Sequence, residues 1–407
     1  MPDTPLRVLY SFPHTLGRAG IAETALQQIL GLARAGVRVI LFCGSMGGVS
    51  LPASIEVHET MTVRGVRVPH RAVGVQRAYD WHDRVVARWI ARHAACIDVV
   101  HAWPRGCLRT LRYAAARGLV ALRESPNAHT ASVMRNSEAA TRHAGVQLVC
   151  GHSHLRDDRV LAREVAEYEA ATAVLVPSDY AHGEFVAEGF PAERLLQHRY
   201  GGDLSRFSAR AAERDPDRPF SVAFVGRGDP TKGLHVALDA WHAAGLEDAV
   251  FNIAGSIAPD YRHKIAGSLE LPGVSALGFV DDVPALLRRA DVLVLPTWTE
   301  GSALVTIEAQ ASGCVPLVSV AAGALGVDGD AFLQHEVGDA AALAAQLREL
   351  YTHRDQLARL SARGTASRSA LSWDAAAAVL AECYRSALAA DARSPQGDHD
   401  DGAESPG

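Results

Sequence analysis

The sequence predicts an α/β fold with mainly parallel sheets, arranged in two domains. Strand-like apolar runs alternate with helical patterns along the chain, as is typical of parallel sheets covered by helices. With 407 residues, the chain is too long for one ordinary core and fits two domains of typical size. The charged residues 209–219 separate two stretches that repeat the same alternation, which predicts a domain boundary close to them.

Short apolar runs predict the strands of the first domain at residues 6–12, 37–43, 97–101, 119–124 and 173–178. Between these strands, helical patterns predict one helix that ends at Ala35 and two more at residues 82–95 and 158–170. The second domain is expected to have strands at residues 220–225, 250–254, 291–295 and 315–320, with a turn at 277–280.

These patterns predict a first domain at 1–203, a second domain at 204–371 and a closing helix at 372–390. The tail at 391–407 is polar, acidic and rich in Pro and Gly, so we expect it to be disordered.

The composition is that of an ordinary globular enzyme, with 48% hydrophobic and 21% charged residues. A net charge of −6 argues against nucleic acid as the main partner. The six cysteines show neither paired spacing nor the density of a disulfide scaffold, which indicates a reducing compartment. The chain shows no signal peptide and no run of the ~18 apolar residues that span a bilayer, so we expect a cytoplasmic protein.

The charge is uneven, because residues 61–123 carry twelve Arg against three Asp. Within the helix predicted at 82–95, one face carries Arg84, Arg88 and Arg92. Such a face could bind anionic lipid headgroups weakly and hold the protein at the membrane periphery. A solvated helix face in an Arg-rich chain is the alternative.

The segment PTWTEGSALVTIEAQASGCVP, residues 296–316, holds two carboxylates, Glu300 and Glu308. Glu300 follows a buried strand, and Glu308 lies in a helix expected to open near Ser302. Ligands of open α/β sheets bind at the carboxyl ends of strands, and helix N-termini there attract phosphate. Carboxylates bind sugar and ribose hydroxyls strongly. The segment therefore indicates a nucleotide-sugar site.

A second segment, residues 220–234, supplies positive charge after another strand. Arg227 and Lys232 lie beside glycines, which suits a diphosphate, since Arg can bind two oxygens at once and Lys acts as a point charge. The chain uses Lys only at positions 232 and 264, so Lys232 stands out in an otherwise Arg-rich sequence.

Two other groups could be mistaken for metal sites. Cys150, His152 and His154 have no matched fourth ligand nearby, and Asp328 with Asp330 lies in a glycine-rich turn after the second domain's strands. We therefore expect no metal.

Taken in order, several motifs resemble the retaining GT-B glycosyltransferases of family 4, also called group 1 glycosyltransferases. They are the glycine loop from Gly17 to Gly20, VLVPSDYAHGEF followed by YGGDLSRF, VGRGDPTKG, ALGFVDDVPALLRRADVLVLPTWTEG, and the pair Glu300 and Glu308. The resemblance covers roughly residues 6–390. It implies two Rossmann-like domains that face each other across a cleft, with the C-terminal helix returning to the first domain. The first domain, at 1–203, is expected to bind the acceptor, and the second, at 204–371, the nucleotide-sugar donor. The basic region 61–123 leads us to expect an anionic or membrane-associated acceptor.

The resemblance assigns roles residue by residue. Arg227 and Lys232 should contact the donor diphosphate, Glu300 the hydroxyls of the transferred sugar, and Glu308 the ribose. The turn that ends at Val280 should approach the base. Other donor contacts are expected from the backbone at Gly17, Gly301, Ser302, Ala303, Leu304 and Val305.

The chain departs from the family pattern in three places. The usual Asn-Gly before the interdomain Asp is Tyr200-Gly201. After Glu300, the common Gly-Phe-Gly-Leu is Gly301-Ser302-Ala303-Leu304. A first-domain His near the transferred sugar is best matched by His129, with Glu124 and Ser125 as rivals for that position.

The resemblance implies a metal-independent transferase that moves a sugar from a nucleotide diphosphate sugar, with a UDP-sugar expected, to an acceptor hydroxyl with retention. No cofactor is expected. The alternatives are a nucleotide-sugar epimerase or sugar phosphorylase on the same fold, or a non-catalytic nucleotide-sugar-binding protein.

Overall fold

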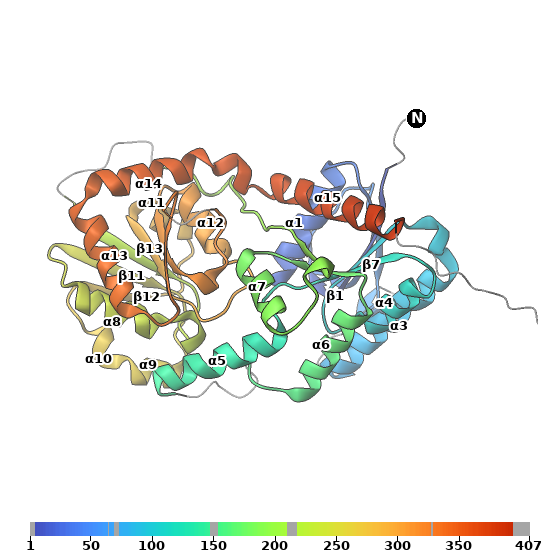
Figure 1. Ribbon diagram of the computed structural model, residues 1–407, viewed down its shortest axis with the longest axis horizontal. Coiled ribbons are helices and arrows are strands. Elements are labelled where there is room, and N and C mark those ends of the chain that lie inside the picture. The colour runs from blue at the N-terminus through green and yellow to red at the C-terminus, as the bar shows by residue number, and fades with distance from the viewer. Residues whose placement is uncertain are drawn as a thin grey trace, which may run out of the picture.

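Two parallel sheets, one in each domain, form the centre of the molecule (Figure 1). The structure is a computed structural model and describes residues 5–63, 65–68, 73–146, 154–209, 218–326 and 329–393. The first sheet has the order β3-β2-β1-β6-β7-β8-β9. Its strands are β1 (Arg7–Leu16), β2 (Arg38–Met46), β3 (Glu56–Glu59), β6 (Val99–Ala102), β7 (Val120–Glu124), β8 (Ala173–Val176) and β9 (Leu195–Gln197). A small antiparallel hairpin joins β4 (Thr62–Val63) to β5 (Val66–Arg67).

The second sheet has the order β12-β11-β10-β13-β14-β15, and its strands are also parallel. They are β10 (Phe220–Val225), β11 (Ala249–Ala254), β12 (Val274–Gly278), β13 (Val292–Leu295), β14 (Val315–Ser319) and β15 (Leu333–His335). The predicted α/β fold with two parallel sheets is confirmed.

Helices cover both faces of the first sheet because successive residues of a strand point to opposite sides. Val8 and Tyr10 of β1 pack under α1 and α15, whereas Leu9 packs under α3 and α4. The helices that begin in this domain are α1 (Ile21–Arg34), α3 (Val75–His93), α4 (Leu108–Ala115), α5 (Thr130–Ala144), α6 (Asp158–Ala170) and α7 (Asp179–Ala187), with 3-10 turns η1 (Ala94–Cys96) and η2 (Ala192–Arg194).

The second sheet is covered in the same way, by α8 and α13 on one face and by α11 and α12 on the other. Its helices are α8 (Leu234–Ala244), α9 (Pro259–Lys264), α10 (Ala266–Leu269), α11 (Val283–Arg289), α12 (Leu304–Ala311), α13 (Ala340–Thr352) and α14 (Arg354–Ala366). Short 3-10 turns are η3 (Pro230–Lys232), η4 (Val320–Ala322) and η5 (Arg368–Leu371).

The last helix, α15 (Trp373–Asp391), returns to the first domain as predicted (Figure 1). It packs against α1, where Gly31 leaves room for Ala377. Inside the sheet layer, the Tyr384 hydroxyl lies 2.6 Å from Nδ1 of the buried His101. The C-terminal helix is therefore part of the first domain's core.

Several element boundaries differ from the sequence-based expectation, and three of them concern the cleft or the helix with the basic face. The helix predicted from residue 82 begins at Val75, because its polar first turns do not show the apolar pattern. The first strand continues to Leu16 after a bulge, and α12 begins at Leu304 rather than Ser302. Helix α5 was not predicted, yet it reaches from the first domain to α9 of the second (Figure 1).

No helix in the described ranges is both long and apolar enough to cross a membrane. The described cysteines, Cys43, Cys96, Cys107, Cys314 and Cys383, are free thiols. Cys150 and the end of the predicted tail, residues 394–407, lie outside the described residues.

The contact between α1 and α15 predicts that Gly31→Ala lowers the melting temperature. An added Cβ would lie 2.6 Å from the Ala377 Cβ, and overpacking of this kind costs about 1–3 kcal/mol. The matched control is Gly183→Ala in α7, where an added Cβ meets nothing within 4 Å. Because Ala favours a helix over Gly by about 1 kcal/mol, the control should raise the melting temperature or leave it unchanged. Thermal unfolding followed by circular dichroism measures both, and a stabilised Gly31→Ala variant would contradict the packing.

Candidate active site

A cleft of about 760 Å³ lies between the two domains, at the carboxyl ends of β1, β10 and β13. Its size is that of a typical small-molecule site. The residues that line it come mainly from segments 17–24 and 200–207 on one side and 225–232 and 300–308 on the other. The predicted residues Gly17, Arg227, Lys232, Glu300, Ser302, Ala303, Leu304, Val305 and Glu308 all line this cleft.

The loop after β10 is shaped by Asp229, which the sequence analysis missed. Its buried carboxylate accepts hydrogen bonds from the backbone N–H groups of Thr231 and Lys232, at 3.0 and 3.2 Å. It also pairs with the half-exposed guanidinium of Arg227 at 2.6 Å. Asp229 therefore fixes the turn that presents both cations to the cleft.

The glycine after Lys232 has a steric reason. Gly233 has φ 70°, and a Cβ there would lie 1.9 Å from the carbonyl oxygen of Pro296, just after β13. The Thr231 carbonyl accepts hydrogen bonds from the Trp298 N–H and the Thr297 hydroxyl. The two predicted segments are thus locked side by side, although more than sixty positions separate them in the sequence.

Lys232 and Glu300 form an ion pair inside the cleft. Burial lowers the pKa of Lys232 to about 8, although Asp229 acts in the opposite direction. A lysine in such surroundings gains from any further negative charge that enters the cleft.

The start of α12 offers fewer backbone donors than expected. The Ala303 N–H donates to the carbonyl of Ala322 at 3.0 Å, so it is already used within the domain. The Ala303 N–H is therefore not available for the contact with donor oxygens that the sequence analysis expected. Leu304 and Val305 begin the helix, where N–H groups lack partners from the preceding turn, and both line the cleft.

Glu308 lies one turn along α12, facing the segment that links the domains. Burial raises the pKa of its carboxyl to about 7, with Arg206 lowering and Asp203 raising it to smaller extents. A carboxyl group with this pKa changes its charge near neutral pH.

Gly17 needs to be glycine for a local reason. It has φ 77°, and a Cβ would lie 2.4 Å from Cγ1 of Val49. The tight turn brings the loop from Gly17 to Gly20 to the edge of the cleft.

Gly301 and Val280 do not line the cleft. Gly301 lies at the contact between the domains, where its carbonyl accepts a hydrogen bond of 2.5 Å from Ser178 Oγ. Val280 follows β12 at the edge of the second sheet, next to the 83% exposed Phe279.

The structure does not bring His129 into the cleft. It precedes α5, where its Nδ1 accepts a hydrogen bond from the Ala131 N–H at 3.3 Å. Its ring packs against Tyr168 and Phe185 and is 7% exposed. A role in capping and packing explains this position.

The two rivals of His129 are also placed. Glu124 is buried beneath the linker between the domains, with its carboxylate 2.6 Å from the Tyr200 hydroxyl and 3.0 Å from His198 Nε2. Ser125 lines a smaller pocket beside the cleft.

Several cleft residues come from the segment that links the domains and from the start of α15, and the sequence analysis gave them no role. They are Tyr200, Asp203, Arg206, Phe207 and Trp373. Tyr200, Asp203, Arg206 and Phe207 belong to YGGDLSRF, which was recognised as a motif without a role for each residue, whereas nothing in the sequence marked Trp373 as a cleft residue.

Across the described ranges, no group of three or more His, Cys, Asp or Glu is arranged to hold a metal ion. Asp330 forms an ion pair with Arg363. Cys150, His152 and Asp328 lie outside the described residues.

Part of the second domain matches a known protein family. Residues 219–353 match the family model described as "Glycosyl transferases group 1". The chain is also 28% identical to D-inositol 3-phosphate glycosyltransferase of Mycobacterium tuberculosis, over 95% of this chain and 84% of that protein. Residues 219–353 are therefore a group 1 glycosyltransferase domain.

Solved structures show that the chain has the GT-B fold of two Rossmann-like domains. Sucrose-phosphate synthase from Thermosynechococcus elongatus superposes with a TM-score of 0.68 at 21% identity, over 95% of this chain and all of that one. HepE from Anabaena in complex with UDP-glucose superposes with a TM-score of 0.62 at 17% identity, over 94% of this chain and all of that one.

Proposed function

We propose that this glycosyltransferase moves a sugar from a nucleotide diphosphate sugar to an acceptor hydroxyl and retains the anomeric configuration. The meeting of Lys232, Glu300 and Glu308 in one cleft carries the proposal. A UDP-sugar is the favoured donor, because the similar HepE structure contains UDP-glucose.

In this proposal, the donor diphosphate takes the place of Glu300 as the partner of Lys232. Glu300 is then free to accept hydrogen bonds from the sugar's hydroxyls, and Glu308 accepts them from the ribose. Arg227 lies half-exposed at the same edge and adds positive charge. Fixed charges of this kind stabilise the leaving group without reorganising during the reaction.

The transfer breaks the bond between the sugar C1 and the diphosphate oxygen and forms a bond from C1 to the acceptor oxygen on the same face. The acceptor's hydroxyl proton passes to the leaving diphosphate. Lys232 and Arg227 supply the positive charge that the leaving diphosphate needs, so we expect no requirement for a divalent metal.

A transfer assay tests the function directly. Purified protein incubated with a panel of UDP-, ADP- and GDP-sugars and mixed acceptors should give a glycoside of the donor's anomeric configuration, also in excess chelator. Loss of activity in chelator that magnesium restores would contradict metal independence. Dependence on inorganic phosphate would indicate a phosphorylase, a changed donor sugar an epimerase, and binding without product a binding protein.

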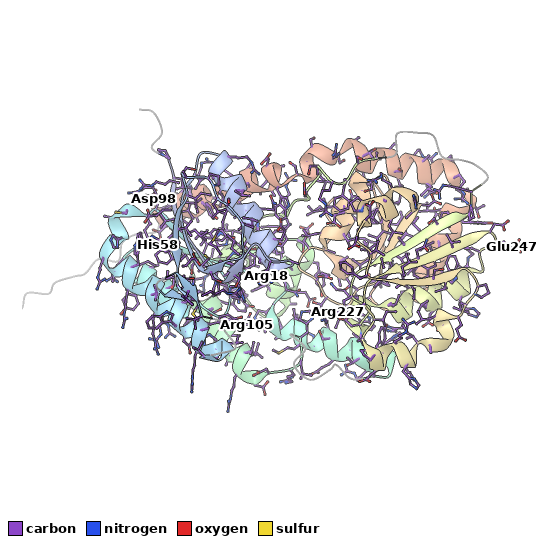
Figure 2. The ribbon with its side chains drawn as sticks, turned by 180° about the vertical axis from the view of Figure 1, so that it is seen from behind. Arg18, His58, Asp98, Arg105, Arg227 and Glu247 are labelled. Atoms are coloured by element: carbon purple, nitrogen blue, oxygen red, sulfur yellow. The ribbon has the colours of Figure 1, made fainter. Side chains whose placement is uncertain are left out.

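Donor binding should depend on Lys232 and Glu308. Because a hydrogen bond to a charged group contributes about 1.5–3 kcal/mol, Lys232→Ala and Glu308→Ala should each weaken UDP binding at least tenfold in calorimetry. The matched control is Glu247→Ala, at the far end of the second domain (Figure 2). Glu308→Ala should matter less for 2′-deoxy-UDP than for UDP.

The same assignment predicts a pH window for UDP binding. Protonation of Glu308 below its pKa of about 7 removes the ribose acceptor, and deprotonation of Lys232 above its pKa of about 8 removes the diphosphate's cation. Affinity should therefore fall on both sides of pH 7–8. Unchanged affinity in folded variants, or a flat pH profile, would refute these roles.

We also propose a weak contact between α3 and anionic membranes. Arg84, Arg88 and Arg92 are exposed along one face of α3, and within the described ranges no carboxylate pairs with them. Trp81 on the same helix is 46% exposed. Exposed Arg beside an aromatic residue suits a lipid interface, at about 1 kcal/mol per Arg.

Sedimentation with phosphatidylserine vesicles at low salt tests this contact. The protein should pellet with the vesicles and be released by salt, and the triple Arg→Gln variant at positions 84, 88 and 92 should stay in the supernatant. A control triple variant at Arg262, Arg288 and Arg289 of the second domain should pellet like wild type. Equal behaviour of the two variants would show that only net charge matters.

A further inference from the structure

A second pocket, of about 280 Å³, opens in the first domain beside the cleft. Ile21 and Pro126 line both spaces, so a molecule in the pocket would lie next to one in the cleft. Its polar lining includes His14, Arg105, Asn127, His154 and Glu164. None of these residues belongs to the predicted donor site.

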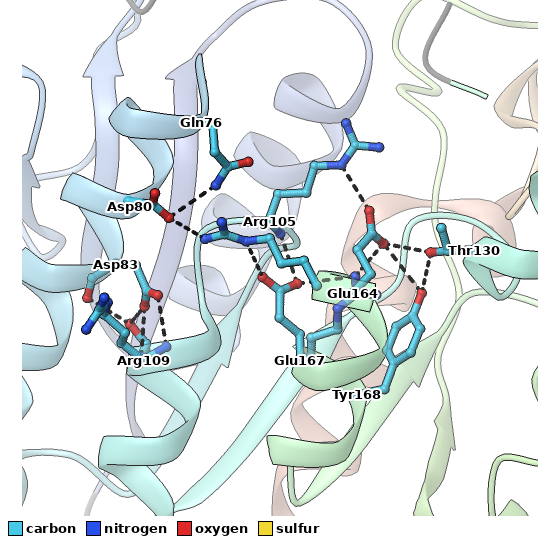
Figure 3. Close-up of polar contacts among 12 residues, drawn as sticks. Gln76, Asp80, Asp83, Arg105, Arg109, Thr130, Glu164, Glu167 and Tyr168 are labelled. Atoms are coloured by element: carbon cyan, nitrogen blue, oxygen red, sulfur yellow. Dashed lines mark hydrogen bonds and ion pairs between the residues drawn. The ribbon is translucent and has the colours of Figure 1, made fainter. Parts of the chain in front are cut away.

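Arg105 is held in the pocket wall at a conformational cost. Its φ is 68°, a left-handed conformation that side chains with a Cβ rarely adopt. Its backbone N–H donates to Glu167 Oε2 at 2.9 Å, and its Nε donates to Glu164 Oε1 at 2.9 Å (Figure 3). Strained backbone that the surrounding residues hold in place is common at active sites and ligand-binding sites.

The carboxylate of Glu164, in the pocket wall, is already paired with Arg105 and Arg123. Glu164 Oε2 accepts hydrogen bonds from Arg123 at 2.7 Å and from the Thr130 hydroxyl at 2.8 Å. Although burial acts to raise the pKa of Glu164, Arg123 and Arg105 lower it to about 2. Glu164 therefore holds Arg105 in place without repelling an anion from the pocket.

The two terminal nitrogens of Arg105 remain available. Among the described residues none accepts a hydrogen bond from them, and Figure 3 shows them turned away from Glu164 and Glu167. The side chain is 36% exposed. Figure 2 shows Arg105 in the middle of the molecule together with Arg18 and Arg227, where the two domains face each other.

We infer that this pocket binds the acceptor, and that the acceptor is a polyol bearing a phosphate or carboxylate that Arg105 holds through its two terminal nitrogens. A guanidinium binds both kinds of oxyanion in this paired manner. Asn127 offers a hydrogen-bonding group for the hydroxyls in the same pocket. The acceptor hydroxyl would then point across Pro126 toward the cleft.

The conformation of Arg105 allows a test that separates binding from folding. Arg105→Gly removes the side chain and relieves the positive φ, and it keeps the N–H bond to Glu167. The variant should fold, with a melting temperature close to that of wild type. Arg105→Lys keeps the charge but loses the paired geometry, and Arg112→Ala on α4 serves as a surface arginine control.

Calorimetry in the absence of a sugar donor measures the binding of glycerol 3-phosphate, glucose 6-phosphate, inositol 1-phosphate and glucuronate. The affinity of each is compared with that of the uncharged polyol or sugar from which it derives. Wild type and Arg112→Ala should bind at least one anionic compound at least tenfold more tightly than its parent. Arg105→Gly should lose this preference, and Arg105→Lys should keep only part of it. The arms with phosphate and with carboxylate identify the anionic group.

This inference rests on the proposed transfer. Measuring UDP binding as well distinguishes a failure of the proposed donor from a failure of the acceptor inference. Absence of UDP binding in wild type would remove the proposed donor, whereas the anion preference is measured without donor. No anion preference in wild type, or one that persists in Arg105→Gly, would overturn the inference. A tenfold loss of UDP affinity in Arg105→Gly would also overturn it, because Arg105 would then belong to the donor site.

Discussion

The cleft depends on the contact between the Gly301 peptide and the first domain. A Cβ at Gly301 would lie 2.1 Å from the carbonyl oxygen of Pro126, and the Gly301 carbonyl accepts the hydrogen bond from Ser178. Within the second domain, a Cβ at Gly323 would lie 2.4 Å from the Gly301 carbonyl oxygen. Backbone thus packs on backbone at the point where the two domains meet. Because Glu300 precedes this peptide and α12 follows it, the contact fixes both against the first domain.

Helix α5 provides a second connection between the domains. It begins at Thr130, in the wall of the smaller pocket, and near its end His143 Nδ1 lies 2.9 Å from His235 Nε2 in α8. Helix α8 follows directly after η3, which carries Lys232. The pocket in the first domain and Lys232 of the second are therefore connected through α5, the start of α8 and the turn η3. A change in the angle between the domains would move both.

The sequence predicted the elements whose signal is local. Buried parallel strands appear as short apolar runs, and the segments after β10 and β13 carry charged residues beside glycines, so both were found. Contacts set by tertiary packing were not readable. The Ala303 N–H is used by Ala322 from a later turn, and His129 is covered by aromatic rings from α6 and α7. The buried face of α5 consists mostly of Ser, Thr and Ala rather than large apolar residues. A motif locates a loop, but the neighbours in space decide which of its atoms remain available.

Both walls of the interdomain space keep a carboxylate beside a cation. In the second domain Lys232 pairs with Glu300, and in the first Arg105 pairs with Glu164. The two pairs differ in what holds the carboxylate. Glu164 has Arg123 as a further partner, so Arg105 can bind an anion and leave the carboxylate satisfied. Glu300 has no such second cation among the described residues, so releasing Lys232 to a diphosphate requires new donors for Glu300. The hydroxyls of a sugar are such donors, which ties diphosphate binding to the presence of the sugar.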